Sequence, residues 1–215
     1  MKKIVRSDVF ALSKEEFIFK LRKLSFCPNL HIDYMDGKLT EKRSPFLFEM
    51  DGIKNYPNID FQLHFMGLYP EIYVEEFKEL GIKSILIHHE AYEFSGEIIK
   101  AIRKIKDAGI DVGLVLNPST DISVVDEFVD KLSCVMLMGV KPGSEGQEFD
   151  SNVLTKVTKL KEKYPELLVQ IDGGVKDSNA KEIAEAGCDC LCVGSAISSQ
   201  ENPEKEYKKL VKLIK

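Results

Sequence analysis

The stretch NLHIDYM, residues 29–35, is an apolar run of strand length that carries a histidine and a carboxylate where a plain buried strand would carry valine or isoleucine. Alternate residues of a strand point to the same face of the sheet, so His31, Asp33 and Met35 share one side of this strand. The run therefore predicts a core strand with polar groups on its inner face.

Seven more apolar runs of strand length lie along the chain: KKIV, IDFQLHFM, SILIH, DVGLVL, CVMLMGV, LLVQI and CLCV. They alternate with stretches in which apolar residues recur every three or four positions, as in amphipathic helices; Phe17, Leu21 and Leu24 are one example. Strands that alternate with helices are typical of a parallel sheet, and eight such units predict a (βα)8 TIM barrel. The weakest unit is the second, where residues 38–58 contain only a short helical patch.

Length and composition narrow the class of protein. The chain has 215 residues, is 44% hydrophobic and carries a formal net charge of −5, which predicts one globular domain spanning residues 1–215. The mildly acidic balance argues against a nucleic-acid partner. We find no secretory signal and no apolar segment long enough to span a bilayer, so we expect a cytoplasmic protein without a membrane partner.

The five cysteines are expected to be reduced thiols, because an odd number in a chain without an export signal does not suggest a disulfide framework. Cys188, Cys190 and Cys192 lie in the apolar run CDCLC, which lacks the CxxC spacing of common metal sites. We expect these three to be small core residues.

Polar residues at strand spacing indicate a reactive end of the barrel. In a (βα)8 barrel, inward polar residues near the carboxyl ends of strands lie at the catalytic mouth. His64 and Met66 in LHFM repeat the pattern seen in HIDYM. Burying such groups without partners costs several kcal/mol, so a bound metal ion is an economical explanation.

Glycine turns after the last two strands predict a phosphate site. Asp172 ends the run VQID and is followed at once by Gly173 and Gly174, while Gly194 and Ser195 follow the last strand. Such turns expose backbone N–H groups at the place where barrels of this kind often bind phosphate. We therefore expect a phosphorylated ligand.

The ordered set HIDYMDG, LHFM, IHHEA, LNPST, MGVKPGSEGQEF, VQIDGGV and VGSAI resembles the ribulose-phosphate 3-epimerases, which are phosphate-binding barrels that interconvert ketose phosphates at carbon 3. The resemblance runs from about Ile4 to the last helix. It implies a barrel of the ribulose-phosphate-binding type, an isomerase, a phosphorylated ketose as substrate, and a homo-oligomer.

The resemblance also implies a metal site and an acid/base pair. His31, Asp33, His64 and Asp172 match the family's four ligands to a divalent cation, such as zinc, iron(II), manganese or cobalt. Asp33 and Asp172 match the acid/base pair. Two groups are needed because epimerisation removes a proton from one face of the substrate and returns one to the other. A bound metal is expected to stabilise the negative charge that develops on the substrate.

Further residues match the family's substrate contacts. They are Ser7, Met35, His64, Met66, Met138, Gly143, Ser144, Glu145, Gly146, Gly173, Gly174, Gly194 and Ser195. Without the surrounding motifs, the three methionines would be interpreted as gap-filling core residues. His88 and His89 show no carboxylate partner in the sequence pattern, so we expect one satisfied strand-end histidine and one solvent-facing histidine.

Three stretches depart from the family. Arg6 stands where the family usually has proline, KLTEKRSPF at residues 38–46 replaces a Val-Pro-Asn turn, and Ser144 and Glu145 make the loop after the sixth strand less rich in glycine. We expect unchanged chemistry, with D-ribulose 5-phosphate and D-xylulose 5-phosphate as the first substrate pair. The alternatives are a tetrulose, hexulose (such as allulose 6-phosphate) or heptulose phosphate, a lyase, and a non-catalytic phosphosugar-binding barrel.

Overall fold

The strands of the protein are parallel to one another and close into a barrel. The computed structural model describes residues 3–143 and 146–215. Within these residues each strand pairs with the next along the chain, and the last pairs with the first to complete the ring. The strands are β1 (Ile4–Phe10), β2 (Asn29–Met35), β3 (Asp60–Met66), β4 (Ser84–His88), β5 (Asp111–Leu116), β6 (Cys134–Met138), β7 (Leu168–Asp172) and β8 (Cys190–Val193). The predicted (βα)8 TIM barrel is thereby confirmed.

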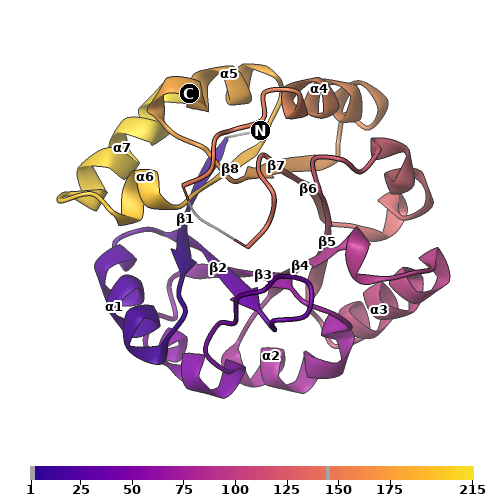
Figure 1. Ribbon diagram of the computed structural model, residues 1–215, viewed down its shortest axis with the longest axis horizontal. Coiled ribbons are helices and arrows are strands. Elements are labelled where there is room, and N and C mark those ends of the chain that lie inside the picture. Colours follow the sequence, from indigo (N-terminus) through magenta and orange to yellow (C-terminus); the bar gives the residue numbers. More distant parts are fainter. Residues whose placement is uncertain (1–2, 144–145) are drawn as a thin grey trace.

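A ring of helices surrounds the barrel (Figure 1). The α-helices are α1 (Lys14–Leu24), α2 (Val74–Leu80), α3 (Ser95–Asp107), α4 (Val153–Lys163), α5 (Asp177–Glu185), α6 (Ser195–Ser198) and α7 (Pro203–Leu213). Shorter 3-10 segments complete the connections: η1 (Leu47–Asn55), η2 (Pro70–Tyr73), η3 (His89–Ala91), η4 (Ile122–Glu127) and η5 (Val129–Lys131). The weak helical signal of residues 38–58 corresponds to η1. In the part of the chain that the structure describes, we find no helix that is both long and apolar enough to cross a membrane.

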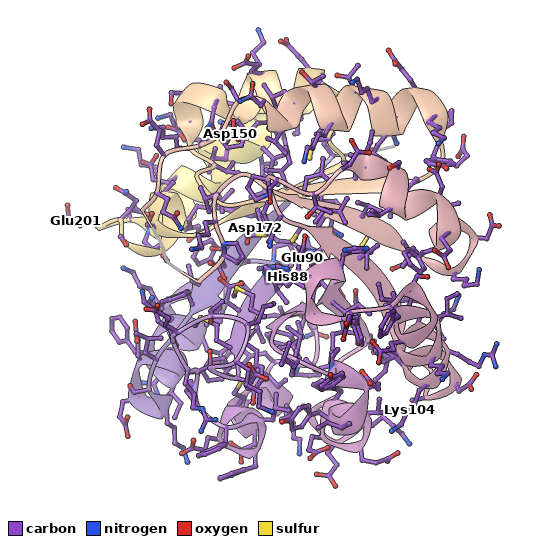
Figure 2. The ribbon with its side chains drawn as sticks, turned by 45° about the vertical axis from the view of Figure 1, so that its right-hand side comes forward. His88, Glu90, Lys104, Asp150, Asp172 and Glu201 are labelled. Carbon is purple, nitrogen blue, oxygen red and sulfur yellow. The ribbon has the colours of Figure 1, made fainter. Side chains whose placement is uncertain are left out.

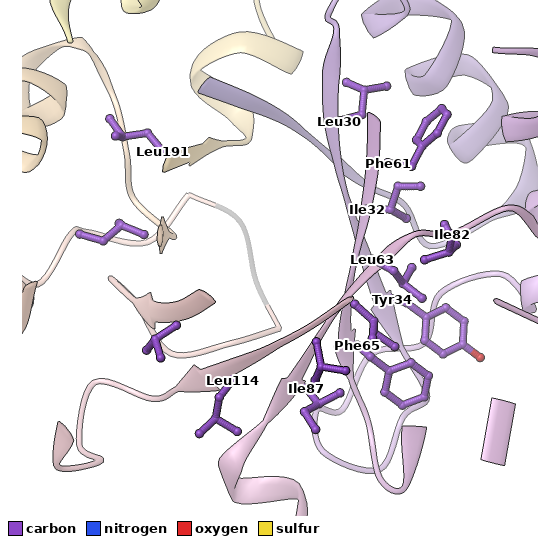
Figure 3. Close-up of a cluster of buried hydrophobic side chains, with 14 of the residues drawn as sticks. Leu30, Ile32, Tyr34, Phe61, Leu63, Phe65, Ile82, Ile87, Leu114 and Leu191 are labelled. Atoms are coloured by element: carbon purple, nitrogen blue, oxygen red, sulfur yellow. The ribbon is translucent and has the colours of Figure 1, made fainter. Parts of the chain in front are cut away.

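The outer faces of the strands form the main hydrophobic core. Leu30, Ile32 and Tyr34 alternate along β2 and point away from the barrel interior, as do the corresponding residues of β3 (Figure 3). Helix α1 contributes the buried side chains Phe17 and Leu21 to the same core. Because burying a large apolar side chain contributes about 1.5–3 kcal/mol, these paired faces hold the helices onto the barrel.

The inner face of the barrel below its mouth carries both apolar and polar side chains, and Arg6, Gln62 and Gln170 are among the buried polar residues there. Cys134, Cys190 and Cys192 belong to one buried interior cluster. All five cysteines are buried, as expected for core residues. The charged side chain of Glu201 lies at the outside of the molecule, whereas Asp172 lies near its middle (Figure 2).

Strand β1 is longer than its sequence pattern suggests. The run KKIV ends at Val5, but β1 continues to Phe10. The polar residues that follow Val5 belong to the strand because they pair with β2 and β8. Arg6 is buried and donates hydrogen bonds to the carbonyl oxygen of Asp60 at 3.1 Å and to its carboxylate at 2.5 Å. Asp60 is the first residue of β3, so Arg6 joins the amino-terminal ends of two strands.

Candidate functional site

A cavity of about 500 Å³ opens at the carboxyl ends of the strands. Parallel strands all end on the same side of a barrel, so the loops that follow them share one rim. The cavity is lined by Asp8, Phe10, Asp33, Met66, Met138, Val140, Lys141, Pro142, Gly143, Gly146, Gln147, Asp172, Gly173, Gly174, Val175, Lys176, Gly194, Ser195, Ala196, Ser199 and Gln200. This cavity is therefore built from the ends of β1, β2, β3, β6 and β7 and from the loops after β6, β7 and β8.

Four buried side chains meet at the base of this cavity. The structure brings His31, Asp33, His64 and Asp172 together, with one nitrogen or oxygen atom of each within 4.8 Å of the others. His64 Nδ1 lies 3.0 Å from Asp33 Oδ1 and 3.5 Å from Asp172 Oδ2. His31 Nε2 lies 3.2 Å from His64 Nδ1. Atoms this close around one point can share a single cation.

Strand register explains why residues distant in sequence converge. Asp33 of β2 lies directly beside His64 of β3, and His31 lies two residues earlier on the same inward face. Asp172 is the last residue of β7, which is separated from β2 in the ring by the two strands β8 and β1. The two carboxylates therefore approach the histidines from different sides.

The neighbours of Asp33 and His64 strongly perturb the pKa of both groups. Burial favours a neutral Asp33, but hydrogen bonds from His31 and His64 outweigh it and lower the pKa of this carboxyl group. Burial likewise opposes charge on His64, but hydrogen bonds to Asp172 and Asp33 raise the pKa of its imidazole to about 9. The site thus favours an ionised Asp33 beside positive charge. Two imidazoles and two carboxylates suit a divalent first-row transition metal, so this donor set fits the predicted metal.

Most of the predicted substrate contacts lie on the cavity wall. Met66, Met138, Gly143, Gly146, Gly173, Gly174, Gly194 and Ser195 all line it. Met35 and His64 are fully buried and do not. Met35 packs under the wall with Phe10 and Met66. Ser144 and Glu145 lie outside the described residues.

The structure does not bring Ser7 to the cavity. Ser7 lies within β1 and not after it, is fully buried, and faces the Cys27 thiol on the helix side of the strand. Its neighbour Asp8 is paired beside His31 and lines the cavity instead. The sequence pattern missed Asp8 because the predicted strand ended at Val5. The alternation of inward and outward side chains was therefore not extended to residue 8.

The glycine turn after β7 needs glycine at both positions. Gly173 and Gly174 adopt φ angles of +95° and +71°. A Cβ atom on Gly173 would lie 2.4 Å from Val140 Cγ2, and one on Gly174 would lie 2.9 Å from Phe149 Cα. Only glycine combines positive φ with such close packing, so the backbone amides of this turn stay accessible from the cavity.

His88 is the main residue whose place the sequence pattern did not reveal. His88 is fully buried, and its Nε2 lies 2.9 Å from His64 Nε2. Its Nδ1 faces Glu90, contrary to the expectation that neither histidine has a carboxylate partner. His89 is partly exposed, and its ring lies against Phe128. The alternation of side chains along β4 could have predicted the inward position of His88, because His88 lies two residues after the inward-facing Leu86.

Glu90 completes this group. Burial favours its neutral form, but hydrogen bonds from His88, Thr120 and the Asn117 backbone outweigh burial and lower the pKa of Glu90 to about 2. Burial lowers the pKa of His88. A charged carboxylate therefore lies next to His88, and the His88 imidazole in turn contacts His64.

The chain resembles known epimerases in sequence. The family model described as the ribulose-phosphate 3 epimerase family matches residues 6–198. A ribulose-phosphate 3-epimerase of Schizosaccharomyces pombe is 32% identical over 179 residues, which cover 82% of this chain and 77% of that protein. One of Bacillus subtilis is 32% identical over 181 residues, which cover 82% of each chain.

Solved structures of sugar-phosphate enzymes share the fold. A 3-keto-L-gulonate-6-phosphate decarboxylase from Vibrio cholerae has a TM-score of 0.78 at 11% identity, with 100% of this chain and 98% of that chain covered. A 3-hexulose-6-phosphate synthase from Salmonella typhimurium has a TM-score of 0.75 at 16% identity, with the same coverage. These likenesses concern the barrel alone, whereas the sequence matches identify the family. The chain belongs to the ribulose-phosphate 3-epimerase family and is an isomerase that acts as an epimerase.

Proposed function

We propose that the protein interconverts D-ribulose 5-phosphate and D-xylulose 5-phosphate, with Asp33 and Asp172 as the acid/base pair at carbon 3. One observation carries the proposal most strongly. The two carboxylates come from β2 and β7, both line the cavity, and both contact His64 Nδ1 at its base. Each is 7% exposed, so each can reach a ligand in the cavity while remaining shielded from bulk water.

Epimerisation explains why two carboxylates are required. A proton leaves carbon 3 on one face of the substrate, and a proton must arrive on the opposite face. In one direction Asp33 accepts the proton and Asp172 donates one; in the reverse direction their roles exchange. The hydrogen bonds that lower the pKa of Asp33 keep this group in its ionised form, which is the form that can accept a proton.

His31, Asp33, His64 and Asp172 would hold one divalent cation, either zinc or iron(II), manganese or cobalt. When bound, such a cation supplies Lewis-acid stabilisation of negative charge on the substrate oxygens, worth several kcal/mol of barrier. The two histidines serve only to bind and orient in this scheme, whereas the two aspartates also move protons.

The phosphate group of the substrate would lie against the glycine turns. Gly173, Gly174, Gly194 and Ser195 line the cavity, and their backbone N–H groups can donate to phosphate oxygens. Lys176 lines the same cavity and adds positive charge. Gly143 and Gly146 belong to the loop that would cover the bound sugar. A cavity of about 500 Å³ accommodates a sugar phosphate.

A 3-epimerase of a longer ketose phosphate, such as a hexulose phosphate, is the second candidate. Asp8 supports it, because this carboxylate lines the cavity and would accept hydrogen bonds from an additional hydroxyl group. The chemistry at carbon 3 would be the same.

Solvent exchange followed by NMR tests the function. We expect D-ribulose 5-phosphate in D2O to lose its carbon-3 proton and to form D-xylulose 5-phosphate. We expect Asp172→Asn and Asp33→Asn to lower the exchange rate by roughly 10²–10⁴-fold, because each removes one proton-transfer group. Asp126→Asn, at an exposed Asp126–Lys163 pair, is the matched control and should leave the rate unchanged.

Three results would contradict the proposal. A tenfold higher kcat/KM for a hexulose phosphate would favour the second candidate. Binding of ketose phosphates without proton exchange would indicate a non-catalytic barrel, and carbon–carbon cleavage would indicate a lyase.

A further inference from the structure

His64 lies between the four-residue cluster and a second buried histidine. Its Nδ1 is the ring nitrogen that faces Asp33 and Asp172, at 3.0 and 3.5 Å. Its other nitrogen, Nε2, lies 2.9 Å from His88 Nε2. Both imidazoles are 0% exposed, and their rings stack with centroids 5.0 Å apart and planes inclined by 16°. His88 therefore contacts the one polar atom of His64 that the cluster does not use.

These contacts determine which way the hydrogen bonds run. A neutral imidazole that binds a cation through Nδ1 carries its proton on Nε2. His64 Nε2 then donates to His88 Nε2, which accepts with its lone pair. The proton of His88 is thereby assigned to Nδ1, and this atom lies 3.4 Å from Glu90 Oε2. An ionised carboxylate can only accept hydrogen bonds. Glu90 therefore requires His88 Nδ1 to be the donor, which sets the direction of both hydrogen bonds in the series His64–His88–Glu90.

Glu90 is held in place by the next unit of the barrel. The backbone N–H of Asn117 donates to Glu90 Oε1 at 2.9 Å, and the Thr120 hydroxyl donates to the same oxygen. Asn117 directly follows β5, so the position of Glu90 depends on two neighbouring strands. Figure 2 shows His88 and Glu90 together near the middle of the barrel.

The other histidine of the cluster has a weaker support. His31 Nδ1 lies 3.4 Å from Gln62 Oε1, and Gln62 Nε2 donates to Ser84 Oγ at 3.3 Å. The series of hydrogen bonds from His31 ends at the neutral hydroxyl of Ser84, whereas the series from His64 ends at the carboxylate of Glu90. The two histidines are thus supported by chemically different partners.

We propose that His88 and Glu90 are positioning residues that hold His64 in the ring orientation and tautomer required of a metal ligand. The inference rests on the metal site of the proposed function and adds two residues to it. A carboxylate behind a metal-binding histidine fixes the ring and increases its basicity, and loss of such partners typically weakens metal binding by 10–100-fold.

Metal affinity tests the proposal without reference to turnover. Zinc and cobalt(II) are titrated into the full-length chain in competition with a chromophoric chelator, and the cobalt absorption spectrum reports the coordination geometry. His88→Phe keeps a flat ring but removes the acceptor, and Glu90→Gln removes the charge. We expect both to raise the metal Kd by 10–100-fold. His88→Gln, whose carbonyl can accept from His64, should restore most of the affinity.

His89→Phe is the matched control, because His89 is the adjacent histidine but lies against Phe128. Its Kd should stay within about threefold of that of the unmodified chain. Circular dichroism verifies that each variant is folded. If His88→Phe does not fold, the metal affinity of Glu90→Gln alone decides the test. The positioning role is overturned if folded His88→Phe or Glu90→Gln binds zinc as tightly as the unmodified chain. Failure of the unmodified chain to bind either metal would instead overturn the metal site itself.

Discussion

The aspartates and histidines at the base of the cavity would be costly in an ordinary core. Each lies in a buried part of its strand, and each is at most 7% exposed. Mutual hydrogen bonds offset the cost of burial, which explains why the pKa of Asp33 falls while that of His64 rises. Burial alone would move both values in the opposite directions.

The buried cysteines show what burial does to a group without a charged partner. Burial raises the pKa of Cys27 to about 12 and that of Cys134 to about 12, from 9.0. A raised thiol pKa leaves stability unaffected below pH 9 and reduces it from pH 9 to 12, because only the unfolded chain ionises there.

We therefore expect the free energy of unfolding to fall between pH 8 and pH 10, with each of these thiols contributing about 1 kcal/mol. Urea unfolding at the two pH values measures the fall, and Cys27→Ala or Cys134→Ala should reduce it. A disulfide reagent at pH 8 should label these thiols rapidly only in denaturant. Rapid labelling of the native protein would contradict the burial of these residues.

Among the elements, the strands decide which side chains meet. Asp33 reaches His64 because β2 and β3 pair in register, and a shift of either strand by one residue would turn its own side chain to the helix side. The alternation of side chains along a strand also explains why Asp8 of β1, and not Ser7, faces the cavity. The loops after the strands then need only present backbone atoms, which the glycine turn after β7 does.

We predict opposite effects for two glycine-to-alanine changes. Gly174→Ala places a Cβ 2.9 Å from Phe149 Cα at a φ of +71°, so it should destabilise the protein by about 1–2 kcal/mol and raise the KM for a ketose phosphate. Gly96→Ala, in helix α3 with no atom within 4 Å of the new Cβ, should stabilise it by about 0.5 kcal/mol. Urea unfolding and steady-state kinetics measure both effects. Equal stability of the two variants would refute the strain assigned to the turn.

At the level of the entire barrel, one cation would connect strands that are far apart in the sequence. Its ligands would come from β2, β3 and β7, so its binding would stabilise the closed ring and not only one loop. A metal at 100 times its Kd adds about 2.7 kcal/mol to the free energy of unfolding.

We therefore expect a chelator to lower Tm by roughly 5–10 °C and zinc to restore it, as measured by calorimetry. His64→Gln should show little response to either reagent, which controls for effects unrelated to the site. An unchanged Tm after metal analysis has verified removal would show that the cation does not stabilise the ring. The homo-oligomer stays a prediction, and light scattering tests it.

Much of the fold and of the candidate site can be predicted from local sequence patterns. Alternating strand and helix periods are properties of short segments, so the eight-stranded barrel follows from them. The convergence of His31, Asp33, His64 and Asp172 was also predictable, because each ends or lies within a recognisable motif whose inward face is defined by a period of two. Family membership follows from the same motifs.

Pairing between distant segments decided the rest. The extent of β1, and hence the inward position of Asp8, depends on hydrogen bonds to β2 and β8 that no local pattern contains. The approach of His88 to His64 and the capture of Glu90 by Asn117 likewise depend on how β3, β4 and β5 lie side by side. Contacts of this kind arise only when the ring closes, because strand register and loop position are set by the packing of the complete barrel.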